Sequence, residues 1–570
     1  MAANSATMGE LFMSDLAAWR ALIERELAGA SFEKLVYRTP EDIDIEPLYT
    51  ERPSDPPIPG EAPYVRGTNL QVTPTELCIR LYGENSVAVE ELNGGANVLW
   101  IDAYNDGALE AAVVANANLI VEIEKNPPQN SLEWISRSRV GTRVWIGIDP
   151  INAVAKGVTQ SDSLATQLSE IPTLICTSQK SLPNVRPLRV STTTFHGAGA
   201  DAADELALGL SSGVAYLRSL VDGGLSITDA ARTLWLQLPV GRDTFGELCK
   251  LRAARILWHK VFAASGVPNE PPPPIHAVAS ARTQALHDPW NNILRVTTEM
   301  FAAILGGAQI VTPRPFDDQF VTVSALGHRV ARNTVLILRD ESHLGRVIDA
   351  AGGSFYIENR TDALAREAWK RFTAIEKDGG VAELIKSGDL RARLDAAWTK
   401  RLNNLSKRKE PIIGVSEYAL IGETLPGDPI PTVSVPAAPA LAEHRDAEIF
   451  EKLRSRIEGA RRDVILLPLG PPSEHRMRNG YSTSLFGIAG IRTRETIQPT
   501  SADVAVICGT DERYATEAAG AARALKAAGA KKVALAGRPG PLEAELRTSG
   551  VDSFLYLGCN VVETLEELLL

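Results

Sequence analysis

The stretch from Asp288 to Phe316 reads DPWNNILRVTTEMFAAILGGAQIVTPRPF. It contains a helical pattern that the turn at Gly306 and Gly307 ends, and the strand-like residues Gln309 to Phe316 follow. A helix that leads directly into an apolar strand is the repeating unit of an α/β protein. We therefore expect this stretch to form one helix and one strand of an α/β fold.

The same alternation of strand-like runs and helical patterns extends over roughly residues 96–360. Eight such runs separated by helices predict a (β/α)8 TIM barrel, in which functional groups lie in loops at the carboxyl ends of the strands. The expected strands are ANVLWIDA, NLIVEIE, TRVWIGID, PTLICTS, PLRVSTTTF, IHAVAS, AQIVTPRPF and SFYIEN.

Two helical segments support the barrel. The helix expected from Asp201 has one apolar stripe and should end at Gly223, and a second helix with Leu364 on its stripe should end at Gly379. The stripe of the first helix consists of Ala203, Leu206, Leu210, Val214, Leu217 and Val221.

The N-terminal region precedes the barrel as a helix and an arm. Residues 14–28 read as an amphipathic helix for which Ser14 can act as N-cap, and the proline-dense segment Pro40 to Pro63 reads as an extended arm. Such an arm commonly lies on another surface, although a poorly packed leader is the alternative.

The C-terminal region reads as a second α/β domain behind a linker. The chain of 570 residues is too long for one usual core. The runs DVILLPLG, DVAVICG, KKVALAG and SFLYLG alternate with helices and predict an open parallel sheet of flavodoxin type, in which a cofactor would lie after DVILLPLG. We expect an N-terminal arm over 1–65, the barrel over 66–410, a proline-rich linker over 411–444 and the second domain over 445–570.

Composition limits the function. A net charge of -11 argues against nucleic-acid binding. The five cysteines are scattered without metal-ligand spacing, which predicts neither a zinc site nor a disulfide framework. No run reaches the length of a membrane span or a signal peptide. These features predict a soluble, cytoplasmic protein.

The stretch Asp288 to Phe316 closely resembles the barrel signature of the adenosylcobalamin-dependent acyl-CoA mutases, the methylmalonyl-CoA mutase family. The resemblance continues through Arg329 to Glu358, RVARNTVLILRDESHLGRVIDAAGGSFYIE, and touches Leu35 to Thr50. It implies a TIM barrel followed by a flavodoxin-like domain of the cobalamin-binding type.

The resemblance fails where family members bind cobalt. Their loop carries Asp-x-His-x-x-Gly, whereas the corresponding stretch here has Ser473 in the place of the Asp, and only His475 remains. His475 either ligates cobalt or forms a local hydrogen bond in a degenerate domain. Further on, Arg538 and Pro539 occupy the place of a Gly-Gly turn that admits the nucleotide tail of cobalamin. The resemblance is therefore to the small, non-cobalamin-binding subunit type.

The barrel keeps few of the family's reactive groups. In FHGAGA, His196 is similar to the family's catalytic histidine and is either a displaced acid or hydrogen-bond donor, or a structural residue. Arg282 resembles the start of a CoA-contacting loop, and Gln309 matches a glutamine that faces the corrin and adenosyl group. Arg80 and Tyr82 remain from a partial pattern, without an assigned role.

The matching positions of the signature stretch have a second interpretation as scaffold. Polar side chains at helix starts and strand ends satisfy buried backbone groups. These positions are Asp288, Pro289, Asn291, Asn292, Arg295, Arg332 and Asn333.

The leading hypothesis is a small subunit that is itself non-catalytic. It would pair with a homologous large catalytic subunit, which would carry adenosylcobalamin and interconvert (R)-methylmalonyl-CoA and succinyl-CoA. One alternative is a catalytic mutase for another acyl-CoA with an altered cobalamin loop. The other is a non-enzymatic scaffold or regulatory homologue, because the chain has no P-loop, G-x-S-x-G or H-E-x-x-H motif.

Overall fold

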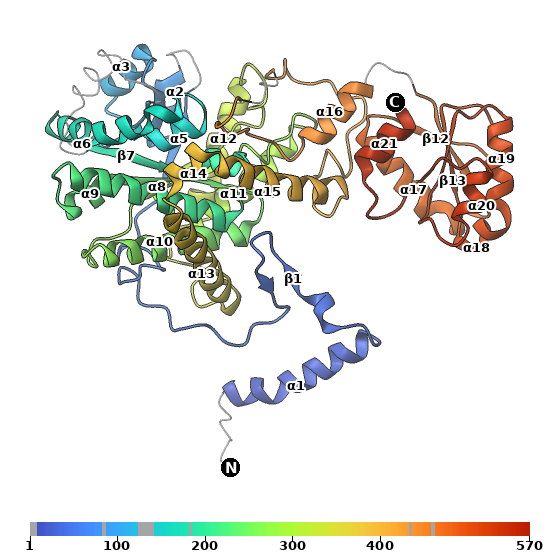
Figure 1. Cartoon of the computed structure of the whole chain (residues 1–570), viewed down its shortest axis with the longest axis horizontal. Helices are drawn as coiled ribbons and strands as arrows, with labels where there is room; N and C mark the ends of the chain where they lie inside the picture. Colours follow the sequence, from blue (N-terminus) through green and yellow to red (C-terminus); the bar gives the residue numbers. More distant parts are fainter. Residues whose placement is uncertain (1–7, 82–86, 124–141, 182–184, 432–435, 458–461) are drawn as a thin grey trace.

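The computed structural model describes residues 8–81, 87–123, 142–181, 185–431, 436–457 and 462–570. Figure 1 shows two α/β bodies along the long axis of the molecule, and the helix α1 (Met8–Glu26) set apart from both. No helix among these residues is long and apolar enough to cross a membrane.

Eight parallel strands close into a barrel, which confirms the predicted (β/α)8 architecture. Each strand pairs with the next along the chain, and the last strand returns to the first. The strands are β3 (Glu76–Arg80), β4 (Val98–Asp102), β5 (Asn118–Ile123), β6 (Val144–Ile148), β7 (Val185–Ser191), β8 (Leu234–Val240), β9 (Ile275–Ala279) and β10 (Ile310–Thr312).

Two of the eight expected strands were wrong, and two real strands were missed. PTLICTS lies inside the helix α6 (Leu164–Ser181), and SFYIEN opens the helix α13 (Phe355–Lys377), where Ser354 accepts a hydrogen bond from the amide of Ile357. A short run of apolar residues fits either a strand or a helix, and at SFYIEN the N-cap stabilises the helix. The missed strands are β3 and β8.

Helices surround the barrel, and one of them confirms a sequence prediction in detail. The helix α8 (Ala202–Asp222) begins after Asp201, whose side chain caps it, and ends at Gly223. The other helices are α2 (Val87–Asn93), α3 (Asp106–Val114), α5 (Pro150–Ala155), α7 (Thr193–Gly197), α9 (Ile227–Thr233), α10 (Thr244–Ala264), α11 (Asn291–Leu305), α12 (Ala325–Leu336), α14 (Val381–Ser387) and α15 (Asp389–Ser406).

The barrel interior is filled by large side chains. Trp100, Trp145 and Trp235 are each at most 6% exposed, and the rings of Trp145 and Trp235 lie 5.3 Å apart. They form one cluster with smaller residues of the barrel strands: Cys78, Val98, Ile120, Val278 and Ile310. The barrel is therefore a packed core along this part of its axis.

A buried ion-pair network crosses the same interior. Arg189 on β7 bonds Glu122 on β5 at 2.5 Å and lies 3.5 Å from Asp149. Glu122 also accepts a hydrogen bond from the indole of Trp100 at 3.1 Å. Burial alone would raise the pKa of Glu122, but the opposite charge of Arg189 outweighs burial and lowers this pKa to about 2. Both groups therefore stay ionised, and their charges compensate each other.

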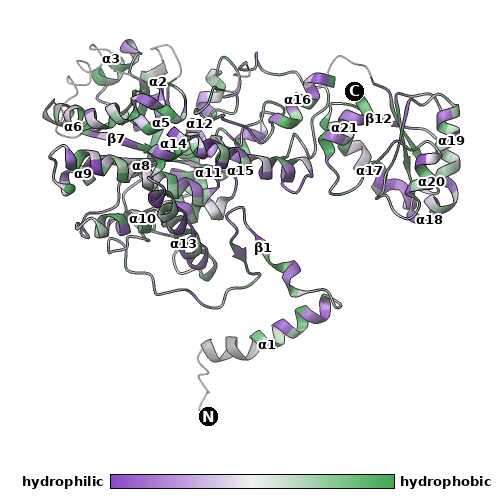
Figure 2. Ribbon diagram, in the orientation of Figure 1, coloured by the Kyte–Doolittle hydropathy of each residue, from purple (hydrophilic) through white to green (hydrophobic). Residues whose placement is uncertain are grey.

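The C-terminal body is a parallel sheet with the strand order β12-β11-β13-β14-β15. The strands from DVILLPLG, DVAVICG, KKVALAG and SFLYLG are present, and the short edge strand β12 was missed. Figure 2 shows β13 in green, in keeping with five buried apolar residues. The elements are α16 (Glu448–Ile457), β11 (Val464–Pro468), α17 (Pro472–Ile488), β12 (Thr493–Glu495), β13 (Val504–Cys508), α18 (Asp511–Arg513), α19 (Ala519–Ala527), β14 (Lys532–Leu535), α20 (Glu543–Thr548), β15 (Ser553–Phe554) and α21 (Val561–Leu569).

The N-terminal arm is held on the barrel at two places. The hairpin of β1 (Tyr37–Arg38) and β2 (Asp44–Ile45) carries Glu41, whose carboxylate accepts a hydrogen bond from the amide of Ala202 at the start of α8. Further along, Arg255 donates to the carbonyl oxygens of Tyr64 and Val65. The helix α1 begins at Met8, so the prediction of Ser14 as its N-cap was wrong.

We expect Arg189→Met to destabilise the protein by about 3 to 5 kcal/mol, because it leaves two buried carboxylates without their cation. The free energy of unfolding in urea measures the loss. The triple variant Arg189→Met, Glu122→Gln, Asp149→Asn removes those charges as well and should recover part of the stability. Equal loss in both proteins would contradict an ionic role for Arg189.

Candidate functional site

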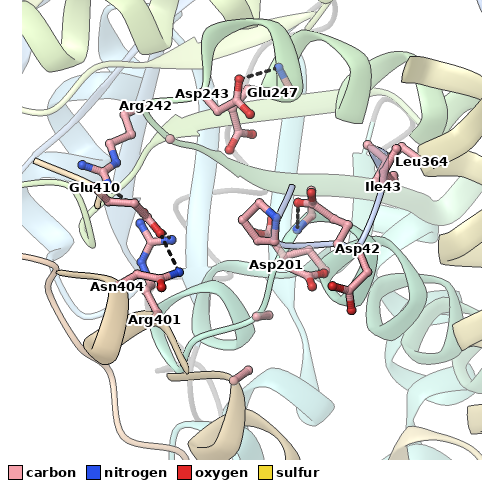
Figure 3. A pocket seen from close by; sticks show the side chains of 18 of the residues that line it. Asp42, Ile43, Asp201, Arg242, Asp243, Glu247, Leu364, Arg401, Asn404 and Glu410 are labelled. Carbon is pink, nitrogen blue, oxygen red and sulfur yellow. Dashed lines mark hydrogen bonds and ion pairs between the residues drawn. The ribbon is translucent and has the colours of Figure 1, made fainter. Parts of the chain in front are cut away.

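A cavity of about 660 Å³ lies where β7, β8 and β9 end, which is the end of a barrel that carries active sites. Its floor contains Gly241, Arg282 and Thr283 from the loops after β8 and β9, and Glu205 from α8. The hairpin of β1 and β2 and the helices α13 and α15 form the walls. Figure 3 shows acidic and basic side chains facing each other across this cavity.

His196 lies directly beneath the cavity floor, in the short helix α7 that follows β7. Its Nδ1 is 2.6 Å from a carboxylate oxygen of Glu205, and its Nε2 is 2.7 Å from the hydroxyl of Ser280. The residue is 2% exposed. The three residues have the distances of a Ser-His-Glu triad, so their electrostatics decide what they can do.

The surroundings of His196 oppose proton uptake. Burial lowers the pKa of His196 well below its ordinary value, and the cations Arg282 and Lys250 lower it further. Glu205 is shared with Lys250, whose ammonium lies 2.8 Å from its second oxygen. A neutral imidazole with both nitrogens engaged is a poor base and a poor acid. The geometry thus supports the structural interpretation of His196.

Lys250 connects this cluster to a second carboxylate. Its side chain is fully buried on α10 and lies 2.6 Å from Glu247, and it also donates to the carbonyl oxygen of Pro239 at 2.7 Å. Burial raises the pKa of both Glu205 and Glu247, and Lys250 opposes the change. One cation therefore serves two carboxylates beneath the cavity.

Arg282 is brought next to His196, as the barrel topology requires of two loops at the same end. Its guanidinium donates to the carbonyl oxygens of His196 at 2.7 Å and Ala200 at 3.0 Å. Only 9% of the residue is exposed. Arg282 thus fixes the loop after β7 while one side of it lines the cavity.

Gln309 lies at the opposite end of the barrel. Its side-chain oxygen accepts a hydrogen bond from the amide of Ile275, the first residue of β9, at 2.7 Å. Its backbone oxygen accepts from the amide of Glu76, the first residue of β3. This places Gln309 at the amino ends of the strands, whereas the cavity and His196 are at the carboxyl ends. The observed contacts close the bottom of the barrel.

His475 lies on the face of α17 that packs on the C-terminal sheet, and it is 8% exposed. Its Nδ1 has no hydrogen-bond partner among the described residues. The first turn of the same helix contains Ser473, which is exposed, and Glu474, which is paired with Arg513 at 2.7 Å. The arrangement lacks the carboxylate that would orient a metal-binding imidazole.

The residues present do not fit the nucleotide tail of a cobalamin. A Cβ at Gly537 would lie 3.1 Å from the ring of Tyr514 and 3.3 Å from the guanidinium of Arg478. Arg478 stacks over Tyr514 at 4.7 Å, and Arg538 lies over the ring of Tyr556. Side chains of the chain itself thus occupy the space beyond β13 and β14.

One buried acid of the site was missed in the sequence. Glu299 on α11 is 0% exposed, and its carboxyl group contacts the hydroxyl of Thr283 at 2.6 Å and the amide of Ser280 at 3.2 Å. The signal was present, because Glu299 follows Val296 by three residues on the apolar stripe of the helix. Tyr82, which the sequence also singled out, lies outside the described residues.

A closed barrel of eight parallel strands places the protein in the class of (β/α)8 barrels. The sequence profile of the family described as methylmalonyl-CoA mutase matches residues 141–466. The methylmalonyl-CoA mutase small subunit of Streptomyces virginiae is 34% identical over 599 residues, which cover 96% of this chain and 95% of the relative.

Two further relatives agree. The small subunit from Propionibacterium freudenreichii subsp. shermanii is 32% identical and covers 96% of this chain and 91% of its own length. The methylmalonyl-CoA mutase of Escherichia coli (strain K12) is 29% identical and covers 72% of this chain and 65% of its own length. The chain belongs to the methylmalonyl-CoA mutase family, and its relatives of matching length carry the name small subunit.

We expect Glu299→Gln to stabilise the protein progressively as the pH rises. Burial raises the pKa of Glu299 from 4.5 to about 8, although the bond to Thr283 opposes the rise. Between these two values the folded protein keeps the proton and the unfolded chain releases it. The wild type should therefore lose stability relative to the variant, by about 1.4 kcal/mol per pH unit at most.

Urea unfolding of both proteins from pH 4 to pH 9 measures the difference. The two curves should run parallel below the unfolded-state pKa and again above pH 8. Glu367→Gln, at a partly exposed position of α13, is the control. Burial raises the pKa of Glu367, but Lys370 and Arg371 outweigh burial and lower it, so this variant should show no divergence from the wild type between pH 5 and pH 8. A constant difference for Glu299→Gln across the range would contradict a raised pKa.

Proposed function

We propose that this chain is the small, non-catalytic subunit of a cytoplasmic heterodimeric mutase. Its partner is a homologous large subunit that binds adenosylcobalamin and interconverts (R)-methylmalonyl-CoA and succinyl-CoA by a radical rearrangement. In this proposal residues 1–65 contact the partner, 66–410 form the barrel, 411–444 link it to 445–570, and the last unit is a degenerate flavodoxin-like domain. The strand order β12-β11-β13-β14-β15 supports the flavodoxin type.

The filled barrel is the observation that carries the non-catalytic role. A mutase for an acyl-CoA needs room for the substrate and must keep a reacting radical away from water. Trp100, Trp145 and Trp235 instead pack together inside the barrel, and Arg189 is neutralised there by Glu122. Side chains from all eight strands contribute to this interior. The barrel interior is therefore filled by side chains that stabilise the fold.

The carboxyl end of the barrel supports the same proposal. His196 has both ring nitrogens occupied by Glu205 and Ser280, and its pKa is held well below the ordinary value. Arg282 binds backbone carbonyl groups of its own barrel. These residues stabilise the loops around the cavity and leave no group free to bind a reacting acyl group among them.

Contacts with the partner would come from the N-terminal arm. Figure 1 shows α1 extending away from the barrel, and Figure 2 shows green and purple alternating along the C-terminal part of this helix. Leu16 and Leu22 on α1 and Ile58 on the arm are between 37% and 55% exposed. Apolar side chains presented on an extended arm suit an obligate interface.

One observation favours the alternative of a catalytic mutase with an altered cobalamin loop. The Nδ1 of His475 is buried and has no hydrogen-bond partner in the part of the chain that the structure describes, and a metal would satisfy it. The misfit at Gly537 and the filled barrel oppose this alternative. The third alternative is a scaffold without a mutase partner, and unlike the other two it predicts that the chain forms no complex with a large subunit.

Cofactor retention and turnover in the pair test the proposal. The chain alone and the chain purified with its large subunit are incubated with adenosylcobalamin, freed of unbound cofactor, and measured by visible spectrum and mutase activity. We expect colour and activity in the pair alone. A coloured lone chain would support cobalt binding by His475, which His475→Ala would then abolish. The absence of any complex would leave the scaffold alternative.

Removal of residues 1–30 should weaken the pairing by tenfold or more while leaving the isolated chain folded, because the hairpin and its Glu41 anchor remain. Analytical ultracentrifugation gives the dissociation constant, and thermal unfolding checks the isolated chain. Leu557→Ser, on the C-terminal body, is a control at an exposed apolar position. Unchanged affinity after the deletion would remove α1 from the interface.

A further inference from the structure

A second cavity, of about 260 Å³, lies beside the first at the carboxyl end of β9. It is lined by the first turns of α11 and by the segment from Pro411 to Ile413, and it is open to solvent on one side. Arg242, Thr283 and Pro411 line both cavities and so form the partition between them. None of the roles derived above uses this second cavity.

The walls of this cavity are mainly apolar. Leu294, Ile412 and Ile413 contribute aliphatic side chains, and Pro411 contributes its ring. Leu294 is 64% exposed and Ile413 is 48% exposed, so part of the apolar lining is in contact with solvent in the isolated chain. An apolar tail that covers these side chains would remove their surface from water.

The cavity also contains a cation without a counter-ion. The guanidinium of Arg295 donates to the side-chain oxygen of Asn292 at 2.5 Å and to the carbonyl oxygen of Ile413 at 2.6 Å. No carboxylate of the described residues forms an ion pair with it within 4.0 Å. Burial lowers the pKa of Arg295, although a guanidinium keeps its charge at neutral pH.

The neighbouring charges are already compensated. Arg242 pairs with Glu410 at 2.6 Å, and Figure 3 shows these two side chains together at the edge of the first cavity. Asp446, which also lines the second cavity, is held by Arg401 through two bonds of 2.7 Å. Glu299 lies nearby but keeps its proton up to about pH 8. Asp288 also acts on Arg295, but its carboxylate accepts a hydrogen bond from Asn291 instead of forming an ion pair with it. Arg295 therefore has no ion pair of its own within 4.0 Å among the described residues.

We propose that this cavity binds a short-chain aliphatic monocarboxylate. The carboxylate pairs with Arg295, and the alkyl chain lies against Leu294, Ile412 and Ile413. A partly buried cation gains a charge-assisted bond from such a ligand, and the apolar walls accept its tail. The volume is slightly smaller than the roughly 300 Å³ at which pockets for drug-sized ligands begin, so the ligand is small.

The same cavity discriminates against dicarboxylates. A second carboxylate at the far end of the ligand would meet either the apolar wall or Asp446, whose carboxylate is ionised because its pKa is held below the usual range by Arg401 despite burial. Burial of an unpaired charge or the approach of two like charges is unfavourable. This site is therefore distinct in chemistry from one for the dicarboxylic acyl groups of the proposed reaction, and it goes beyond the proposed function.

Ligand-observed saturation-transfer NMR on the purified full-length chain tests the proposal at constant ionic strength. The ligands are butyrate, butan-1-ol, n-butylammonium and succinate. We expect saturable binding of butyrate and at least tenfold weaker binding of the other three, since a bond to a charged group is worth about a factor of ten or more. Equal binding of butan-1-ol, or no saturable binding of butyrate, would overturn the proposal.

Variants separate the charge from the cavity shape. Arg295→Met should weaken butyrate binding about tenfold or more, Arg295→Lys should restore part of it, and Arg366→Met on the exposed face of α13 should have no effect. Thr298→Leu fills the cavity from an exposed helix position without touching the cation, and it should also abolish binding. Full binding by both Arg295→Met and Thr298→Leu would place butyrate elsewhere and reject the site.

Discussion

The ion pair between Arg189 and Glu122 is the interaction on which the barrel interior depends. Both side chains are buried, and separation would leave a charge in a medium that cannot solvate it. Glu122 in turn positions the indole of Trp100, while Arg189 lies 5.9 Å from the ring of Trp235. The ion pair and the aromatic cluster therefore fill this part of the barrel interior together and leave no room there for a channel.

Buried carboxylates are also paired with cations at the carboxyl end of the barrel. The N-caps of α8 and α10, Asp201 and Asp243, are each bound by an arginine of α13, Arg371 and Arg360. Below them Lys250 joins Glu205 and Glu247. Barrel enzymes bind substrate at this end of the strands, whereas here the charged residues at this end hold α13 against the barrel. Arg295 is the exception described above.

The sequence predicted the fold well at the level of architecture and less well at the level of single strands. The helix of α8 was predictable because Asp201, the apolar stripe and Gly223 all agree. β8 was missed because Leu234–Val240 follows α9 without a turn and contains Pro239. Local pattern alone could not show that PTLICTS belongs to a helix, because its burial depends on packing against α8.

Prediction of the site was limited by the same kind of information. The barrel topology made it predictable that His196 and Arg282 would meet, since both follow strands at the carboxyl end. Gln309 precedes its strand, and this alone places it at the amino end. The neutral state of His196 depends on burial and on the cations Arg282 and Lys250, and the raised pKa of Glu299 depends on burial by residues from elsewhere in the chain. Such long-range electrostatics leave no local pattern in a single sequence.

The anchoring of the hairpin bears on the order of events during synthesis. Glu41 is translated before its binding partner, because the backbone amide that donates to it belongs to Ala202, 161 residues later. Arg371, which donates to the backbone oxygen of Glu41, follows after 330 residues. The arm therefore has no fixed direction until most of the barrel has been translated and folded. A partner that recognises the anchored arm would select completed chains over nascent ones.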